Sequence, residues 1–265
     1  MKLLMAEFRE GLFTSLSNNF VSAYLHGSIA FPEYNPEAGD IDFYVITRRS
    51  LNGTEIKSVA HLHRSLAAKF EFGSKLDGFY IPYAAARMHE NPRNLVYGAH
   101  GRIHRGGPDD AWALHREHFA RSAYIRIYGP RASRVFSRPN WTEIRSALYR
   151  QLVYARKIID SDPWWSVLNL CRLVYTFKTE NVAVSKLGAA RWALKKLASR
   201  WKPVIRSAVK RYKRTADRRD LTILRKDAKT FLGFASVRVI AFDIASNSRR
   251  EGTAYLRSSR AEARR

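Results

Sequence analysis

Apolar residues in the first half of the chain fall into short runs that predict strands, separated by segments with helical spacing. Residues 21–25 and 43–46 are apolar runs of strand length, and residues 75–81 form a third run after a Gly-Ser turn. Apolar positions recur at helical spacing over residues 54–70, between the second and third runs, and before them up to about Leu16. The pattern therefore predicts a sheet in which a helix joins the second strand to the third.

The rest of the chain is predicted to be mainly helical. Residues 98–110 are rich in Gly, His and Arg, and we expect them to form a mobile surface loop. A helix over 111–122 and a short strand over 125–130 should follow. Further helices are expected over residues 141–159, 164–177, 185–197, 204–212 and 222–244.

This organisation predicts an α+β fold, with a mixed sheet and helices followed by a helical bundle. We place the first domain at residues 1–138, the helical domain at 139–245, and a basic, disordered tail at 246–265. The formal net charge is +24. Residues 1–138 contain 18 Lys and Arg against 13 Asp and Glu, a balance of +5, which leaves +19 for residues 139–265. The positive charge is thus concentrated in the predicted helical domain.

The single cysteine excludes an internal disulfide and is consistent with a reducing cytoplasm. Cys171 lies in an apolar helical segment, which favours a place in the core over a role as nucleophile. Charged residues interrupt the apolar start of the chain at Glu7, so a signal peptide is not expected. No apolar run approaches the ~20 residues of a membrane span, and no Cys/His spacing indicates zinc.

Candidate chemistry lies at a Gly-Ser turn and an Asp-x-Asp pair. Gly27 and Ser28 follow the first strand, and Asp40 and Asp42 lead into the second. Residues i and i+2 of a strand share a face, so both carboxylates point the same way, and their repulsion favours a cation between them. Oxygen ligands of this kind suit Mg²⁺, while a Gly-Ser turn can bind phosphate through its backbone and hydroxyl. Alone, an Asp-x-Asp pair is common and Gly-Ser is only a turn.

A third acid is expected from the next strand. Asp77 is the sole acid within residues 75–81, so it is our candidate for the strand beside Asp42. A solvent-facing residue is the simpler interpretation. Glu71 is the competing acid, but it lies nearer to the end of the predicted helix.

The joint pattern resembles the nucleotidyltransferase superfamily that includes DNA polymerase beta and the antibiotic adenylyltransferases. Three further segments resemble the narrower group of streptomycin and spectinomycin (aminoglycoside) adenylyltransferases, namely residues 128–136, 168–175 and 185–194. The resemblance implies a bacterial-type enzyme that transfers AMP from ATP, with Mg²⁺ as cofactor, to a hydroxyl of a small molecule, most readily an aminoglycoside or aminocyclitol.

The resemblance also implies roles for individual residues. Asp40 and Asp42 would hold Mg²⁺, Gly27 and Ser28 would contact the ATP phosphates, and Asp77 would act as general base or complete the metal site. The helical domain would supply groups for the triphosphate. Lys186 is the first candidate for this role, and the weaker ones are Arg191, Lys210 and Tyr212.

The chain departs from the family pattern at several positions. Gly39 stands where the family often has Ser before the first aspartate, and Val174 stands where a tryptophan stacks on the drug. Thr179 is nearest to the position of an acid that contacts the drug, with Glu180 as a replacement.

The distribution of charge raises an alternative acceptor. Residues 191–229 hold 15 Lys and Arg against three Asp, with aromatic residues between them, as expected of a surface that meets RNA or polyphosphate. A solvated basic helix face explains the same pattern. Three hypotheses therefore remain: a small-molecule adenylyltransferase, a nucleotidyltransferase acting on nucleic acid, and a nucleic-acid-binding module with a vestigial site. The intact trio of aspartates argues against the third.

Overall fold

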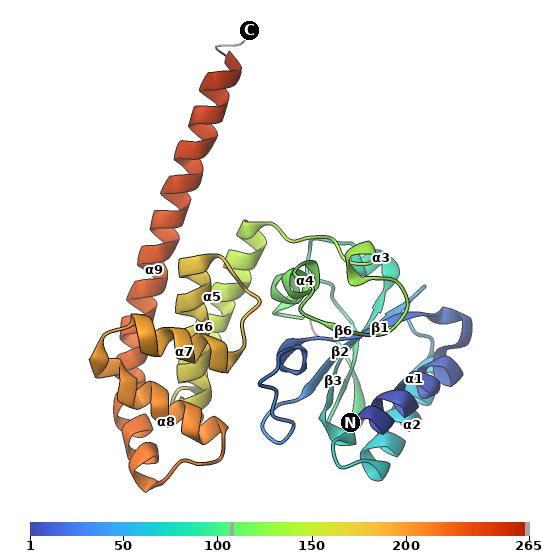
Figure 1. Ribbon diagram of the computed structural model, residues 1–265. Coiled ribbons are helices and arrows are strands. Elements are labelled where there is room, and N and C mark those ends of the chain that lie inside the picture. Colours follow the sequence, from blue (N-terminus) through green and yellow to red (C-terminus); the bar gives the residue numbers. More distant parts are fainter. Residues whose placement is uncertain (107–108, 263–265) are drawn as a thin grey trace. The chain divides into compact units, whose positions relative to one another are not determined.

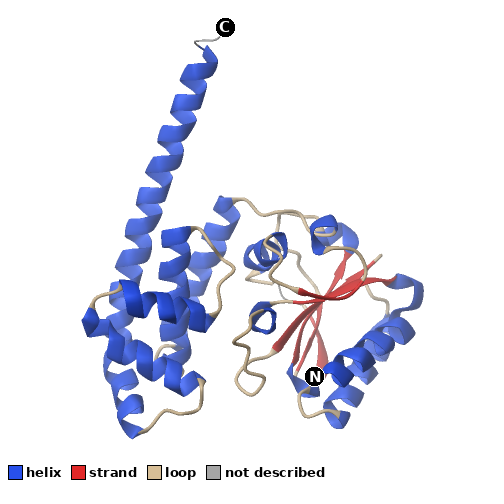
Figure 2. Ribbon diagram, viewed as in Figure 1, coloured by secondary structure: helices blue, strands red, loops and turns tan. Residues whose placement is uncertain are grey.

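The computed structural model describes residues 1–106 and 109–262, and the chain divides into two compact units, Met1–Arg150 and Gln151–Arg265. The α+β prediction is confirmed: the first part of the chain forms a mixed sheet with helices, and the second part is helical (Figures 1 and 2). The described chain also contains single 3₁₀ turns at Ser17–Asn19, Gly27–Ala30, Gly73–Lys75, Ala132–Arg134 and Ser199–Trp201.

The sheet of the first unit has six strands in the order β5-β4-β3-β2-β1-β6. These strands are β1 (Phe20–Leu25), β2 (Ile41–Thr47), β3 (Leu76–Pro82), β4 (Val96–Ala99), β5 (Arg102–Arg105) and β6 (Ile125–Tyr128). Among the strands that the structure describes, only β2 and β3 run parallel, and helix α2 (Gly53–Lys69) joins them. Parallel neighbours need such a crossover, which agrees with the strand, helix and strand predicted from the sequence.

Helices cover both faces of this sheet (Figure 1). On one face, α1 (Lys2–Leu16) and α2 pack on alternate strand residues such as Phe43 and Val45. On the other face, α3 (Tyr83–Ala86) and α4 (Trp112–Ala120) cover Tyr44 and Ile46. Successive residues of β2 are therefore buried on opposite faces of the sheet, as the two-residue period of a strand requires.

The predicted loop over residues 98–110 is wrong for its first part, because a β-hairpin forms there. Strands β4 and β5 pair antiparallel, with Ala99 opposite Arg102. The two residues between them, His100 and Gly101, have φ values of 51° and 71°. A two-residue turn with positive φ at both positions matches the twist of a hairpin, and here it lies in a polar stretch without strand alternation. Residues 107–108 lie outside the described part.

A buried histidine packs beneath this hairpin and gives a prediction about pH. His63 of α2 is 0% exposed, and its Nε2 lies 2.9 Å from the Tyr80 hydroxyl. Burial lowers the pKa of His63 to about 4. Because the unfolded chain binds the proton more readily, stability contributed by the neutral ring is complete above about pH 6.5 and is lost as the pH falls toward 4.

Replacement of His63 by glutamine should remove this dependence. We expect the parent's free energy of unfolding to fall by about 3 kcal/mol more than that of His63→Gln between pH 7 and pH 4. Denaturant titrations at several pH values measure the difference, and His61→Gln, at an exposed position of the same helix, is the matched control. Parallel curves for parent and His63→Gln would contradict the prediction.

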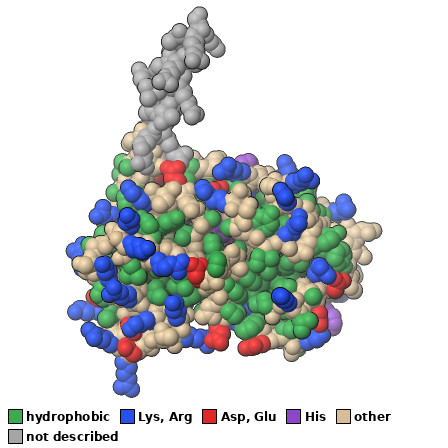
Figure 3. Space-filling model, in the orientation of Figure 1, with side chains coloured by type: hydrophobic (Ala, Val, Ile, Leu, Met, Phe, Trp, Pro, Cys, Tyr) green, Lys and Arg blue, Asp and Glu red, His purple; other side chains and the backbone are tan. Residues whose placement is uncertain are grey.

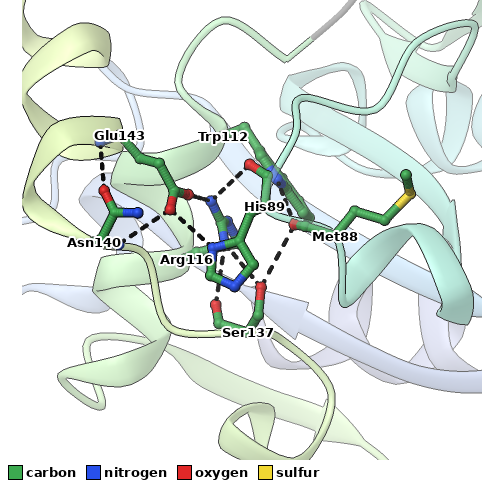
Figure 4. Close-up of polar contacts among 7 residues, drawn as sticks. All are labelled: Met88, His89, Trp112, Arg116, Ser137, Asn140 and Glu143. Atoms are coloured by element: carbon green, nitrogen blue, oxygen red, sulfur yellow. Dashed lines mark hydrogen bonds and ion pairs between the residues drawn. The ribbon is translucent and has the colours of Figure 1, made fainter.

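A buried arginine attaches the start of α5 (Trp141–Ile158) to the first unit (Figure 4). The Arg116 side chain is 0% exposed, stacks on Trp112, and donates to Ser137 Oγ at 2.8 Å and to the carbonyl of His89 at 3.1 Å. It also forms an ion pair with Glu143 in the first turn of α5. These contacts lie within the first compact unit, which ends inside α5 at Arg150. The domain boundary between residues 138 and 139 stays a prediction.

The second unit is a bundle around α6 (Pro163–Thr179). Ten residues of α6 are buried, among them Cys171, so the cysteine lies in the core as expected. Helices α7 (Lys186–Lys196), α8 (Lys202–Tyr212) and α9 (Arg218–Glu262) all pack on α6. Within the described residues, no helix combines the length and apolar character needed to cross a membrane.

The last described residues of the chain belong to helix α9. Helix α9 continues from Arg218 to Glu262, and residues 263–265 lie outside the described part. The predicted start of the tail, at residue 246, falls inside this helix. Lys and Arg side chains are spread over the face shown in Figure 3, with fewer Asp and Glu side chains among them.

Candidate active site

The Gly-Ser turn lies directly against the second aspartate. Strand β1 ends at Leu25, the backbone N–H of His26 donates to the carbonyl of Asp42 at 3.0 Å, and Gly27 follows with φ of +67°. A Cβ atom at Gly27 would lie 2.1 Å from Asp42 Oδ2. Both the positive φ and the close approach require glycine, so the turn brings backbone next to a carboxylate without an intervening side chain.

Three acids gather at one end of the parallel strands. Asp42 of β2 lies beside Asp77 of β3 in the parallel register, and Asp40 immediately precedes β2. The side chains of Asp42 and Asp77 are half-buried, whereas Asp40 is exposed. Glu71 lies in the turn after α2 and is exposed, whereas Asp77 lies on the strand that pairs with β2. Strand pairing thus brings together residues that are 35 positions apart.

The electrostatics of Asp77 reflect this arrangement. Burial raises its pKa, and the negative charge of Asp40 raises it further. His100 and His104 of the β4–β5 hairpin act in the opposite direction. The sequence did not indicate these two histidines, because they lie in the segment that we expected to be a loop. A raised pKa makes Asp77 a stronger base than an ordinary aspartate.

The segment that carries Asp40 is held in place by side-chain and backbone contacts. Lys75 Nζ, just before β3, donates to the carbonyls of Pro36 and Glu37 at 2.7 and 2.8 Å. The backbone N–H of Gly39 donates to the carbonyl of Asn35 at 2.9 Å. A Cβ at Gly39 would lie 3.1 Å from Ser28 Oγ, so the glycine that departs from the family pattern leaves room for the hydroxyl of the Gly-Ser turn.

The carboxylates suit a hard divalent cation. Two adjacent half-buried acids with a third nearby repel one another, and the raised pKa of Asp77 expresses that repulsion in part. The glycine cradle beside Asp42 leaves space that a side chain would fill. Across residues 1–106 and 109–262, no three His, Cys, Asp or Glu side chains already form a group that could hold a metal ion. The metal role of the three acids stays a prediction.

A group of buried polar residues behind Asp42 was not predicted. Tyr44 and Asp109 are buried and hydrogen-bonded, and His115 contacts both. The only signal in the sequence was an aspartate just before a helix that carries histidines. The histidines are scattered along the sequence, and only tertiary packing brings them together.

The predicted residues of the helical unit have different environments. Lys186 begins α7 after the cap residue Ser185, and its Nζ lies 4.9 Å from the Trp165 ring centre. Arg191 lies on the same helix and is exposed. Lys210 forms an ion pair with Asp220 at 3.0 Å, and Tyr212 is only 6% exposed. Lys210 and Tyr212 are thus engaged or buried within the helical unit, and the roles of all four residues stay predictions.

The positions that depart from the drug-binding pattern are engaged within the helical unit. Val174 is 0% exposed, so its side chain packs in the bundle. Thr179 donates to the carbonyl of Tyr175 at 2.9 Å. Glu180, in a left-handed conformation with φ of 55°, accepts from the hydroxyl of Ser246 at 2.6 Å. The replacement acid therefore has a partner on α9.

Comparison with known proteins agrees with the resemblance seen in the sequence. Residues 134–237 match the family described as aminoglycoside adenylyltransferase, C-terminal domain. The crystal structure of spectinomycin adenyltransferase AAD(9) from Enterococcus faecialis, with ATP and spectinomycin, is similar with a TM-score of 0.72. The similarity covers 90% of this chain and 99% of that chain at 16% identity, and so shows a shared fold. No curated protein matches the chain. Over its helical part the chain is therefore similar to the C-terminal domain of aminoglycoside adenylyltransferases, and as a whole it shares the fold of AAD(9).

Proposed function

We propose that this chain is a nucleotidyltransferase that transfers AMP from ATP to a hydroxyl of an aminoglycoside or aminocyclitol, with Mg²⁺ as cofactor. The observation that carries the proposal is the pairing of Asp42 and Asp77 on adjacent strands beside the Gly27 turn. The family match over residues 134–237 supports the enzyme class and the kind of acceptor. The AAD(9) complex with ATP supports ATP as co-substrate.

In this proposal Asp40 and Asp42 would hold the cation, which would neutralise phosphate charge when bound. The Gly27 and Ser28 turn binds phosphate oxygens through its backbone N–H groups and the Ser28 hydroxyl. Lys186 and Arg191 supply positive charge to the triphosphate. Asp77, with its raised pKa, accepts the proton of the acceptor hydroxyl as that oxygen attacks the α-phosphorus and pyrophosphate leaves.

The positive charge of the protein bears on the choice of acceptor. A protein of net charge +24 repels a polycationic drug at long range, but salt screens this repulsion over about 8 Å. Local acids then decide whether the acceptor binds. The nucleic-acid alternative, which used the basic residues 191–229, has no support among the comparisons, and one of its lysines, Lys210, already pairs with Asp220.

The proposal is tested by incubating the protein with α-labelled ATP and Mg²⁺ and offering, in separate reactions, an aminoglycoside and aminocyclitol panel and total RNA. We expect label on one of the small molecules, with release of pyrophosphate, and none without divalent cation. Label on RNA alone, or on no acceptor, would overturn the proposal.

Asp77→Asn separates the role of general base from that of metal ligand. As a base, Asp77 contributes to proton transfer and not to ATP binding, so turnover should fall by roughly 10²–10⁴-fold while the affinity for Mg-ATP changes little. Turnover assays and calorimetry measure the two effects, and Glu71→Gln, at the exposed competing acid, is the control. Loss of ATP binding would instead make Asp77 a metal ligand.

A further inference from the structure

A buried cluster of hydrogen-bonded side chains lies behind Asp42. Tyr44 follows Asp42 by two residues on β2, so both side chains belong to the same face of the sheet. The Tyr44 hydroxyl donates to Asp109 Oδ2 and lies 2.8 Å from His115 Nδ1. His115 Nδ1 is also 2.9 Å from Asp109 Oδ2. One carboxylate oxygen therefore joins a strand residue to a residue of α4.

Asp109 remains ionised in this cluster. Burial alone would raise the pKa of Asp109, which is 4% exposed. The charge of His115, hydrogen bonds from His115 and Tyr44, and the backbone N–H of Ala111 outweigh burial and lower its pKa. An ionised carboxylate can only accept hydrogen bonds, so His115 Nδ1 carries a hydrogen atom and donates this hydrogen bond to Asp109. Asp109 thereby fixes the orientation of both neighbouring rings.

The cluster reaches the Gly-Ser turn through His26. The His26 ring is 3% exposed and stacks on Tyr44, with ring centres 4.7 Å apart and planes at 15°. The His115 ring contacts the His26 ring at a tilt of 53°, with ring centres 4.4 Å apart. His26 immediately precedes Gly27, and its backbone N–H donates to the Asp42 carbonyl. A shift of the His26 ring would therefore move the backbone that lies against the Asp42 carboxylate.

We propose that Asp109 is a positioning residue for nucleotidyl transfer, which holds Tyr44 and His115 around His26 and so fixes the Gly27 and Ser28 turn against Asp42. This inference rests on the proposed function, because the turn is taken to bind the phosphates of ATP. A small displacement of a positioned group is costly in catalysis: about 1 Å at a reacting centre can lower the rate by about 10²-fold.

A pair of matched variants tests the inference. Tyr44→Phe removes one buried hydroxyl from the cluster. Tyr80→Phe removes another buried hydroxyl, paired with His63 at 2.9 Å, on the opposite face of the sheet. We expect both variants to lose similar thermal stability. Only Tyr44→Phe should weaken Mg-ATP binding and lower kcat, each by about ten-fold, because only this hydroxyl supports the turn.

Asp109→Asn should show the same pattern with a larger fall in kcat, and Tyr44→Phe decides the matter if Asp109→Asn does not fold. Calorimetry with Mg-ATP and turnover assays well below the midpoint of unfolding provide the readouts. Tyr44→Phe values equal to those of Tyr80→Phe, in a parent that binds ATP, would overturn the positioning role alone. A parent that binds no ATP would overturn the proposed function together with this inference.

Discussion

Asp42→Asn is expected to lower AMP transfer by at least about 10³-fold while the protein remains folded. Asp42 supplies a charge beside the Gly27 turn and beside Asp77, where a cation on the triphosphate would be held. Loss of transition-state charge stabilisation worth several kcal/mol corresponds to a rate effect of this size. The fold should tolerate the change, because the substitution removes one of several mutually repelling carboxylates. Turnover with the labelled acceptor and the thermal midpoint measure the two effects.

Asp160→Asn is the control for Asp42→Asn, because Asp160 lies on the surface with a side chain that is 74% exposed and pairs with Lys229. This variant should keep full turnover. If Asp42→Asn retained more than about a tenth of the parental rate, the carboxylate would not be part of the cation site.

Arg116→Met is expected to lower the free energy of unfolding by about 3–5 kcal/mol. The Arg116 side chain is 0% exposed and pairs with Glu143, so its removal leaves a partly buried carboxylate with less compensation. His89 Nδ1 at 2.8 Å remains near Glu143, and it carries a charge only when protonated. Denaturant unfolding of the full chain measures the loss. The first turn of α5 should detach first, since Glu143 is its attachment to Arg116 (Figure 4).

Arg9→Met is the matched control, because Arg9 forms an exposed ion pair with Glu10, and such pairs contribute at most about 1 kcal/mol. A second comparison separates pairing from packing. Arg116→Met combined with Glu143→Leu should lose less stability than the two single changes added together, since no unpaired charge remains. Strict additivity would contradict the role of the ion pair.

Much of the first unit could be predicted because its signals are local. The runs that became β1, β2 and β3 and the helix that became α2 are visible in the sequence, and they suffice to place Asp77 beside Asp42. The helix order of the second unit follows in the same way from apolar spacing. The β4–β5 hairpin was missed because its turn, His100 and Gly101, lies among polar residues.

The surroundings of the site could not be predicted, because they depend on contacts between distant segments. Asp109 and His115 are six positions apart, but they form a buried cluster only together with Tyr44, which is 65 positions before Asp109. The pattern of residues around Arg116 likewise gives no sign that a charged side chain is buried there. Buried polar networks follow from packing and leave no periodic signal.

The order of strands also bears on how this protein avoids aggregation. The two outermost strands, β5 and β6, have four residues each, and they carry exposed arginines at Arg102, Arg105 and Arg126. Short edge strands with charged side chains are poor templates for pairing with a strand of another molecule. The long apolar strands β1, β2 and β3 lie between them, so the segments most able to form intermolecular sheets are hydrogen-bonded on both sides. Substituting these edge arginines by valine would expose the sheet to edge-to-edge growth.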